Sequence, residues 1–187
     1  LIYSDIYLSD PNAASWYHNK VEHLKRADLL LSISNASRDE AIDILDFPEG
    51  QVINISSAAD PQFFPMPLSG SQSGQLHRFG LFKPYLMYSG ATDWRKNHRR
   101  LISAYSKLPA NIRSAHQLAF VGVLKAEHRT DFKKLAKKCG LAEDELVIIG
   151  RVSDEEINLL YNLCKLFVFP SWHEGFGLPV LEAMQCG

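Results

Sequence analysis

The stretch LFVFPSWHEGFGLPVLEAM, residues 166–184, decides the fold of this chain. Its apolar run 166–169 ends at Pro170 and predicts a short buried strand. A polar loop with two glycines follows, and Pro179 suits the first position of a helix. A strand that passes through a loop into a helix is the repeating unit of parallel α/β folds.

Three earlier stretches repeat this pattern in order along the chain. Each is an apolar run followed by a polar loop and an amphipathic segment. The predicted strands are 85–89, 118–123 and 146–149, and the predicted helices are 98–108, 127–138 and one that opens after Ser153, where Ser153 and Glu156 have the spacing of a capping box. Four such units in a row predict a doubly wound parallel sheet.

The amino-terminal part holds a shorter version of the same pattern. The apolar run 29–33 predicts a strand, Ser34 can cap a helix over 35–45, and 52–55 predicts a second strand. The prolines, serines and glycines of 61–74 then predict chain without regular structure.

The order of these elements predicts two domains. We expect the end of one α/β domain over residues 1–62, a linker over 63–80 and a second α/β domain over 81–187. The chain begins at Leu1 and stops directly after a helical pattern, so we expect a fragment that is incomplete at both ends.

The composition is that of a packed globular chain. Of the 187 residues 46% are hydrophobic and 22% are charged, which excludes wholesale disorder. The net charge of -1 supplies no overall field to hold nucleic acid, so we expect no nucleic-acid partner. The three cysteines have no paired spacing and fit a reducing, cytoplasmic compartment better than a disulfide framework.

The loop inside residues 166–184 has the features of a ligand site. In an open α/β sheet, ligands gather beyond the carboxyl ends of the strands. Gly175 and Gly177 allow close approach of a ligand to the backbone, and the N–H groups of Phe176, Gly177 and Leu178 would lie at the positive end of the next helix. Glu174 and Glu182 would repel a bare phosphate but can accept hydrogen bonds from hydroxyl groups. A polyol attached to a phosphate meets both conditions.

These residues resemble the retaining GT-B glycosyltransferases of group 1, or family four, which includes mannosyl, glucosyl and sucrose synthase-type enzymes. The signature of that family is two glutamates separated by seven residues, and Glu174 and Glu182 match it. The resemblance implies the GT-B fold, with two Rossmann-like α/β domains. It also implies that Glu182 binds ribose hydroxyls, that Glu174 faces the donor sugar, and that the amides around Phe176 and Gly177 hold the sugar or the diphosphate.

A second loop, residues 91–97, resembles the basic loop with which that family clamps the donor diphosphate. Lys96 stands where the family has its phosphate lysine. Many members also have an arginine directly after the strand glycine, where this chain has Ala91 and Thr92, and Arg95 is the candidate to supply the missing charge. Positive groups there would stabilise the charge that develops on the leaving diphosphate, so Lys96, Arg95 and Glu174 are the expected catalytic residues.

Four further residues complete the expected nucleotide-sugar site. His173 lies beside Glu174, and Gly90 closes the strand 85–89. Arg151 and Val152 follow the strand 146–149, where the family reads the base mainly through backbone atoms. We interpret Trp94 and Trp172 as packing residues, and Arg99 and Arg100 as a solvated helix face.

The resemblance extends upstream. Residues 1–11 look like a loop on the acceptor side, 27–40 like a late strand and helix of the first domain, and 54–60 like the crossover into the second domain. Many members place a histidine in the first of these segments, where this chain has Ser4 and Asp5, so no catalytic histidine is assigned. The family is about twice as long as this chain, which therefore should not turn over substrate alone.

The implied function is transfer of a mannose- or glucose-type hexose from a UDP- or GDP-linked donor to a glycan or lipid-linked acceptor, with retention. No Asp-x-Asp triplet occurs, so we expect neither a metal nor another bound cofactor. A lipid-linked acceptor implies peripheral association of the full-length protein with the inner face of the membrane. Two alternatives remain: a glycosidase carboxylate pair, and a non-catalytic nucleotide-sugar-binding module, which Ser4 and the missing arginine favour.

Overall fold

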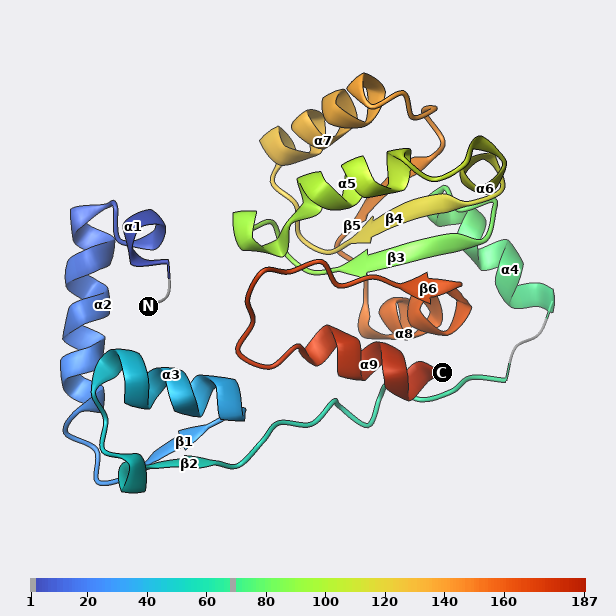
Figure 1. Ribbon diagram of the computed structural model, residues 1–187. Coiled ribbons are helices and arrows are strands. Elements are labelled where there is room, and N and C mark those ends of the chain that lie inside the picture. The colour runs from blue at the N-terminus through green and yellow to red at the C-terminus, as the bar shows by residue number, and fades with distance from the viewer. Residues whose placement is uncertain (1–2, 68–69) are drawn as a thin grey trace. The chain divides into compact units, whose positions relative to one another are not determined.

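A computed structural model describes residues 3–67 and 70–187 of the chain (Figure 1). The chain divides into two compact units, Leu1–Ala58 and Ala59–Gly187. Within the described ranges no helix has the length and apolarity needed to cross a membrane. The cysteines Cys139, Cys164 and Cys186 are free thiols.

The first unit is a small parallel α/β unit. Its elements are α1 (Ser4–Tyr7), α2 (Pro11–Leu24), β1 (Leu30–Ser32), α3 (Asn35–Leu45), η1 (Glu49–Gln51) and β2 (Val52–Asn54). The strands pair in parallel, and the Ser34 side chain accepts a hydrogen bond from the backbone N–H of Ser37 at the start of α3. The predicted strand, capped helix and strand are thus confirmed.

Helix α2 was not predicted, although its start is readable in the sequence. The Asp10 side chain accepts a hydrogen bond from the Asn12 N–H at 2.9 Å, and Pro11 occupies the first helical position. We expect a loop over residues 1–11, but α1 forms one helical turn within it. Residues 1 and 2 lie outside the described residues.

The second unit is built on a four-stranded parallel sheet. Its strands are β3 (Tyr85–Ser89), β4 (Gln117–Val121), β5 (Leu146–Gly150) and β6 (Leu166–Phe167), in the spatial order β5-β4-β3-β6. From β3 the chain moves outward through β4 to β5 and then returns to place β6 on the other side of β3. This is the predicted doubly wound arrangement, although β4 and β6 end earlier than the predicted 118–123 and 166–169.

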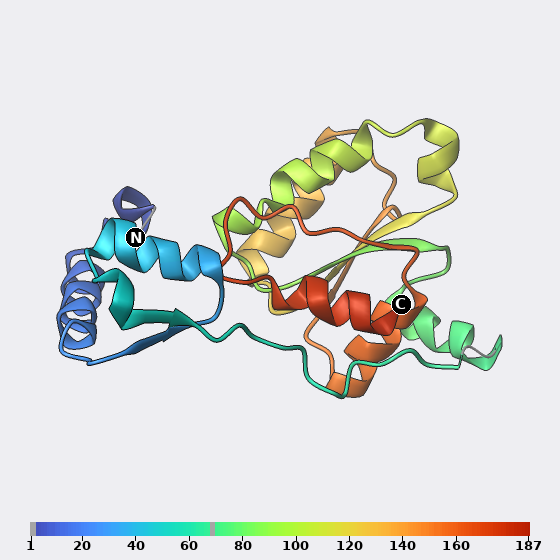
Figure 2. The ribbon, with the colours of Figure 1, turned by 60° about the horizontal axis from the view of Figure 1, so that its bottom comes forward.

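Helices cover both faces of this sheet. In Figures 1 and 2, α5 (His98–Ser106) and α7 (Ala126–Lys138) lie on one face, and α8 (Asp154–Leu163) and α9 (Leu178–Cys186) lie on the other. The short helix α6 (Ala110–Ser114) joins α5 to β4. The capping box of Ser153 and Glu156 is present at the start of α8, as predicted.

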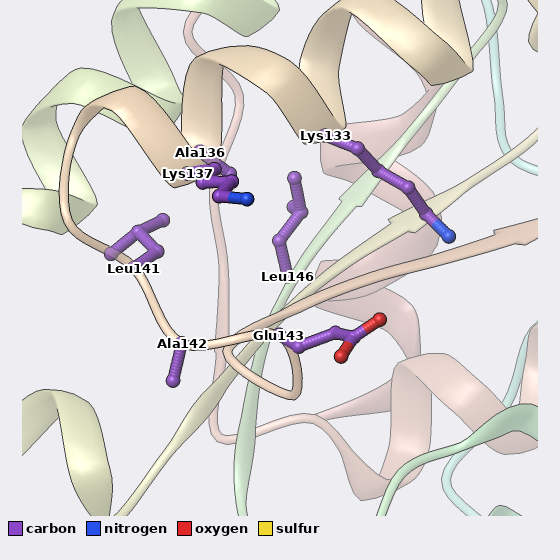
Figure 3. A pocket seen from close by; sticks show the side chains of 7 residues that line it. All are labelled: Lys133, Ala136, Lys137, Leu141, Ala142, Glu143 and Leu146. Carbon is purple, nitrogen blue, oxygen red and sulfur yellow. The ribbon is translucent and has the colours of Figure 1, made fainter.

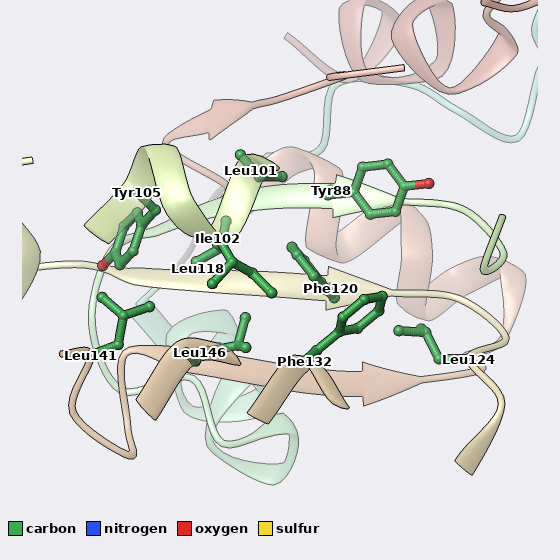
Figure 4. Packing of buried hydrophobic residues seen from close by; sticks show 11 residues of the cluster. Tyr88, Leu101, Ile102, Tyr105, Leu118, Phe120, Leu124, Phe132, Leu141 and Leu146 are labelled. Atoms are coloured by element: carbon green, nitrogen blue, oxygen red, sulfur yellow. The ribbon is translucent and has the colours of Figure 1, made fainter. Parts of the chain in front are cut away.

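The strand pleat divides the buried residues into two cores. Tyr88 and Phe120 face α5 and α7, where they pack with Ile102 and Phe132 (Figure 4). Their neighbours along the strands, among them Met87, Ala119 and Val121, pack on the opposite side with Leu160, Tyr161 and Cys186. Successive side chains on a strand point to opposite faces, so a sheet with helices on both sides is buried throughout.

The prediction of irregular structure between the two domains is wrong over much of the linker. Helix α4 (Gly70–Leu76) and the helical turn η2 (His77–Phe79) lie inside the predicted linker 63–80, whereas residues 68 and 69 lie outside the described residues. Leu76 and Phe79 pack against the second core, and this burial outweighs the poor helix propensity of the glycines and serines.

The chain before this helix belongs to the second unit. Phe63 is buried, the Met66 N–H donates to Asn162 Oδ1 at 2.7 Å, and Asn162 Nδ2 donates to the Phe64 carbonyl at 3.0 Å. The Asn162 side chain thus accepts from one backbone N–H and donates to one backbone carbonyl of residues 64–66, as the backbone of a neighbouring strand would.

Candidate functional site

The candidate site lies where the winding of the sheet reverses. The neighbouring strands β3 and β6 are followed by helices on opposite faces, α5 and α9. Connections that leave in opposite directions open a crevice at the carboxyl ends of such strands. The loop after β3 carries Arg95 and Lys96, and the loop after β6 carries Glu174.

These two loops are hydrogen-bonded to each other. The Trp172 N–H donates to the Arg95 carbonyl at 2.8 Å, and Asn97 Nδ2 donates to the Pro170 carbonyl at 3.0 Å. Within the first loop, Asp93 caps the turn η3 (Trp94–Lys96) by accepting a hydrogen bond from the Arg95 N–H at 2.9 Å. These hydrogen bonds fix the backbone that carries Arg95 and Lys96.

Lys96, Arg95 and Glu174 form one ion cluster. Lys96 Nζ lies 2.6 Å from Glu174 Oε1, and Arg95 Nη1 lies 3.2 Å from Glu174 Oε2. Arg95 Nη1 also donates to the His173 carbonyl at 3.1 Å. The side chains of Lys96 and Glu174 are only 15% and 18% exposed, so water screens this pair less than a surface pair.

The electrostatics of the cluster favour an ionised glutamate. Burial raises the pKa of the Glu174 carboxyl, but the hydrogen bond from Lys96 and the charges of Lys96 and Arg95 outweigh it. The pKa of Glu174 therefore lies below its ordinary value. Arg95 Nε also lies 3.5 Å from Asp93 Oδ1, so Arg95 is shared between two carboxylates.

Glu182 lies on α9 and contacts a buried tyrosine. The Tyr161 hydroxyl of α8 lies 2.8 Å from Glu182 Oε2 and 2.9 Å from Ser89 Oγ, at the end of β3. Sequence reasoning missed both Tyr161 and Ser89. The one available signal was a hydroxyl on the apolar face of α8, because a buried hydroxyl requires a polar partner.

Glycines allow the strand ends at the crevice to approach closely. Gly122 follows β4 with a φ of +127°, and a Cβ atom there would lie 2.3 Å from the Gly90 carbonyl oxygen. Gly177 has a φ of +102° and precedes α9, which begins at Leu178. Pro179 is therefore the second helical residue, where we predicted the first.

The other predicted site residues follow strands of the same sheet. Gly175, Phe176 and Leu178 lie between Glu174 and the first turn of α9. Arg151 is exposed after β5, whereas Val152 packs partly against the second core.

Trp94 and Trp172, which we interpret as packing residues, are only partly buried. Their exposed fractions are 42% and 51%. The Arg100 guanidinium lies 4.2 Å from the ring centroid of Trp172, so Arg100 contacts the loop and is more than part of a solvated helix face.

A separate hollow of about 350 Å³ lies away from these residues, between α7 and the loop before β5 (Figure 3). Leu146, the first residue of β5, lines it, so it opens at the amino end of the sheet. None of the predicted site residues lines this hollow, and ligands of open α/β sheets bind at the opposite end.

Comparisons with known proteins point to one enzyme family. The family model "Glycosyl transferases group 1" matches residues 77–187. The "Serotype-specific mannosyltransferase WbdA" of Escherichia coli is 38% identical over 188 residues, which cover 100% of this chain and 23% of that protein. The "O-antigen chain mannosyltransferase B" of Escherichia coli is 34% identical over 170 residues, 89% of this chain and 43% of that protein.

Solved structures agree on the fold. The crystal structure of Anabaena HepE in complex with UDP and glucose superposes with a TM-score of 0.77 at 22% sequence identity. The match covers 90% of this chain and 45% of that chain. This chain therefore spans less than half the length of the proteins named here.

Proposed function

Because this chain belongs to the group 1 glycosyl transferases and has the GT-B fold, we propose that it takes part in moving a hexose from a nucleotide diphosphosugar to an acceptor hydroxyl. The names of the two mannosyltransferase relatives favour mannose as that hexose. The observation that carries the proposal is the ion cluster of Lys96, Arg95 and Glu174 at the reversal point of the sheet.

Lys96 and Arg95 would bind the diphosphate of the donor. As the bond between the anomeric carbon and the diphosphate oxygen breaks, negative charge grows on that oxygen. Two cations on a loop whose backbone is held by hydrogen bonds would stabilise this charge, and such stabilisation lowers the barrier when it is stronger in the transition state than in the ground state.

The two glutamates would bind hydroxyl groups. Glu174 leaves the two cations when the diphosphate takes its place, and its carboxylate then accepts hydrogen bonds from the donor sugar. Glu182 would accept hydrogen bonds from the ribose. The proposed remaining contacts are His173 to the sugar, Gly90 and residues 175–178 to the sugar or diphosphate, and Arg151 and Val152 to the base.

Calorimetric titration with UDP, GDP and ADP, without added metal, tests this donor site. We expect a preference for one nucleotide and weaker binding by Glu182→Ala. Equal affinity of the variant and the unmodified protein would contradict the ribose role of Glu182. Lys96→Ala should weaken the binding of a nucleoside diphosphate more than the binding of the nucleoside. An equal loss of affinity for both ligands would contradict the phosphate role of Lys96.

The proposed reaction proceeds with retention and without a metal ion, on a glycan or a lipid-linked glycan at the inner face of the membrane. Transfer from a nucleotide diphosphomannose in the presence of EDTA, with the anomeric configuration of the product read by NMR, tests these points. Ser4, and Ala91 and Thr92 in place of the arginine, favour a second candidate, a binding module without catalysis. Nucleotide binding without transfer to any acceptor would select that candidate.

A further inference from the structure

The ring of Tyr161 is held in a single orientation. Tyr161 lies on α8 and is 3% exposed. Phe63 and Phe167 both meet its ring edge-on, with ring centroids 5.7 and 5.4 Å away. Such contacts on two sides fix where the hydroxyl group points.

The hydroxyl of Tyr161 carries one proton and has two neighbours, Ser89 Oγ and Glu182 Oε2. An ionised carboxylate only accepts, so Tyr161 donates to Glu182. The Ser89 hydroxyl then donates to the Tyr161 oxygen. The contacts form a directed chain, Ser89 to Tyr161 to Glu182, in which each proton has one acceptor.

These two hydrogen bonds link three elements of the crevice. Ser89 ends β3 directly before Gly90, Tyr161 lies on α8, and Glu182 lies on α9. The contact uses one acceptor position of Glu182, and a carboxylate has about four, so it can still accept hydrogen bonds from a ligand. A carboxylate on a flexible side chain loses rotamer freedom when it binds, and a fixed contact removes part of that cost beforehand.

We propose that Tyr161 is a positioning residue for the nucleotide site, with its hydroxyl orienting the Glu182 carboxylate toward the ribose hydroxyls. This inference rests on the proposed function, because it takes Glu182 to be the ribose ligand. Tyr161 itself does not touch the nucleotide. Its effect should therefore appear only in binding that depends on the ribose hydroxyls.

The test compares GDP and UDP with their 2′,3′-dideoxy counterparts by calorimetry. The ratio of the two affinities measures how well the protein reads the ribose hydroxyls. In Tyr161→Phe we expect this ratio to fall by about threefold to tenfold, the effect of one hydrogen bond. Glu182→Ala should lower the ratio less when it is introduced into the Tyr161→Phe variant than when it is introduced into the unmodified protein. The reason is that the effect of Tyr161 passes through Glu182, so the two effects are not additive.

Tyr85→Phe is the matched control. Tyr85 is 0% exposed in the same core, and its hydroxyl donates to the Leu160 carbonyl at 2.7 Å, one residue before Tyr161. Its loss costs a buried hydrogen bond of similar length without touching Glu182. We expect Tyr85→Phe to lower stability and to leave the affinity ratio unchanged.

An unchanged ratio in Tyr161→Phe, or an equal fall in Tyr85→Phe, overturns the positioning role. If Tyr161→Phe does not fold, Ser89→Ala replaces it, and a ratio unchanged in that variant overturns the role equally. Absence of ribose discrimination in the unmodified protein refutes the proposed function of Glu182 instead. The two failures are therefore distinguishable.

Discussion

Replacing Gly122 by alanine should destabilise the second unit severely. The new Cβ would lie 2.3 Å from the oxygen and 2.8 Å from the carbon of the Gly90 carbonyl, both backbone atoms. Real Cβ contacts are longer than 3.0 Å, so one of the two strand ends must move. The Gly90 N–H donates a hydrogen bond to the Val121 carbonyl at 2.9 Å, and the Gly122 N–H donates to the Gly150 carbonyl at 2.8 Å. Such a movement would therefore strain these hydrogen bonds as well.

The expected loss follows from two costs. A φ of +127° is costly for a residue with a side chain, by about 1–3 kcal/mol, and overpacking against backbone adds about 1–3 kcal/mol. We expect Gly122→Ala to lower the free energy of unfolding by about 3–5 kcal/mol, measured by urea unfolding followed by circular dichroism.

Two other glycines of the same unit separate these costs. Gly140 has a φ of +77°, and a Cβ added there would meet no atom of the described residues within 4 Å, so Gly140→Ala should cost only the backbone strain, about 1–2 kcal/mol. Gly74 lies in α4 with an ordinary φ and the same free space, so Gly74→Ala should be neutral or stabilising by up to about 1 kcal/mol. A loss in Gly122→Ala no larger than in Gly140→Ala would refute the reasoning.

Three further predictions concern stability. Burial, helped by the charges of His128 and Lys96, lowers the pKa of His98 to about 4, so the stability that neutral His98 contributes is complete above pH 6.5 and is lost as the pH falls toward 4. The free energy of unfolding should fall between about pH 7 and 4.5 by about 2–3 kcal/mol less in His98→Phe than in the unmodified protein. Parallel pH profiles of stability for the two proteins would contradict this. Ser153→Ala removes a capping box and should cost about 1 kcal/mol in urea unfolding, whereas the exposed Ser9→Ala should cost less. Asn162→Ala should speed proteolysis within residues 59–67, measured by limited digestion, and an unchanged cleavage rate would show that these bonds do not hold the segment.

Much of the fold could be predicted from the sequence because its signals are local. Apolar runs, capping residues and glycines mark the predicted strands and helices within a few residues. The alternation of these elements then predicts a doubly wound parallel sheet. The resemblance to a known family supplied Lys96, Arg95 and Glu174, and the structure brings these three together.

The missed features depend on contacts between distant residues. Ser89 and Tyr161 are 72 positions apart, so no local pattern links them. Helix α4 has poor propensity and forms where Leu76 and Phe79 reach a core built by later residues. Helix α2 is different, since Asp10 and Pro11 are a local start signal.

The ion cluster has a consequence for selectivity among small anions. A free phosphate ion that reaches Lys96 must displace a carboxylate already bound at 2.6 Å, and it offers the displaced Glu174 fewer hydroxyl donors than a sugar does. A sugar diphosphate brings hydroxyl groups that can satisfy that carboxylate. If the proposed donor site holds, the crevice should therefore prefer a sugar diphosphate to inorganic phosphate without needing a lid or a gate.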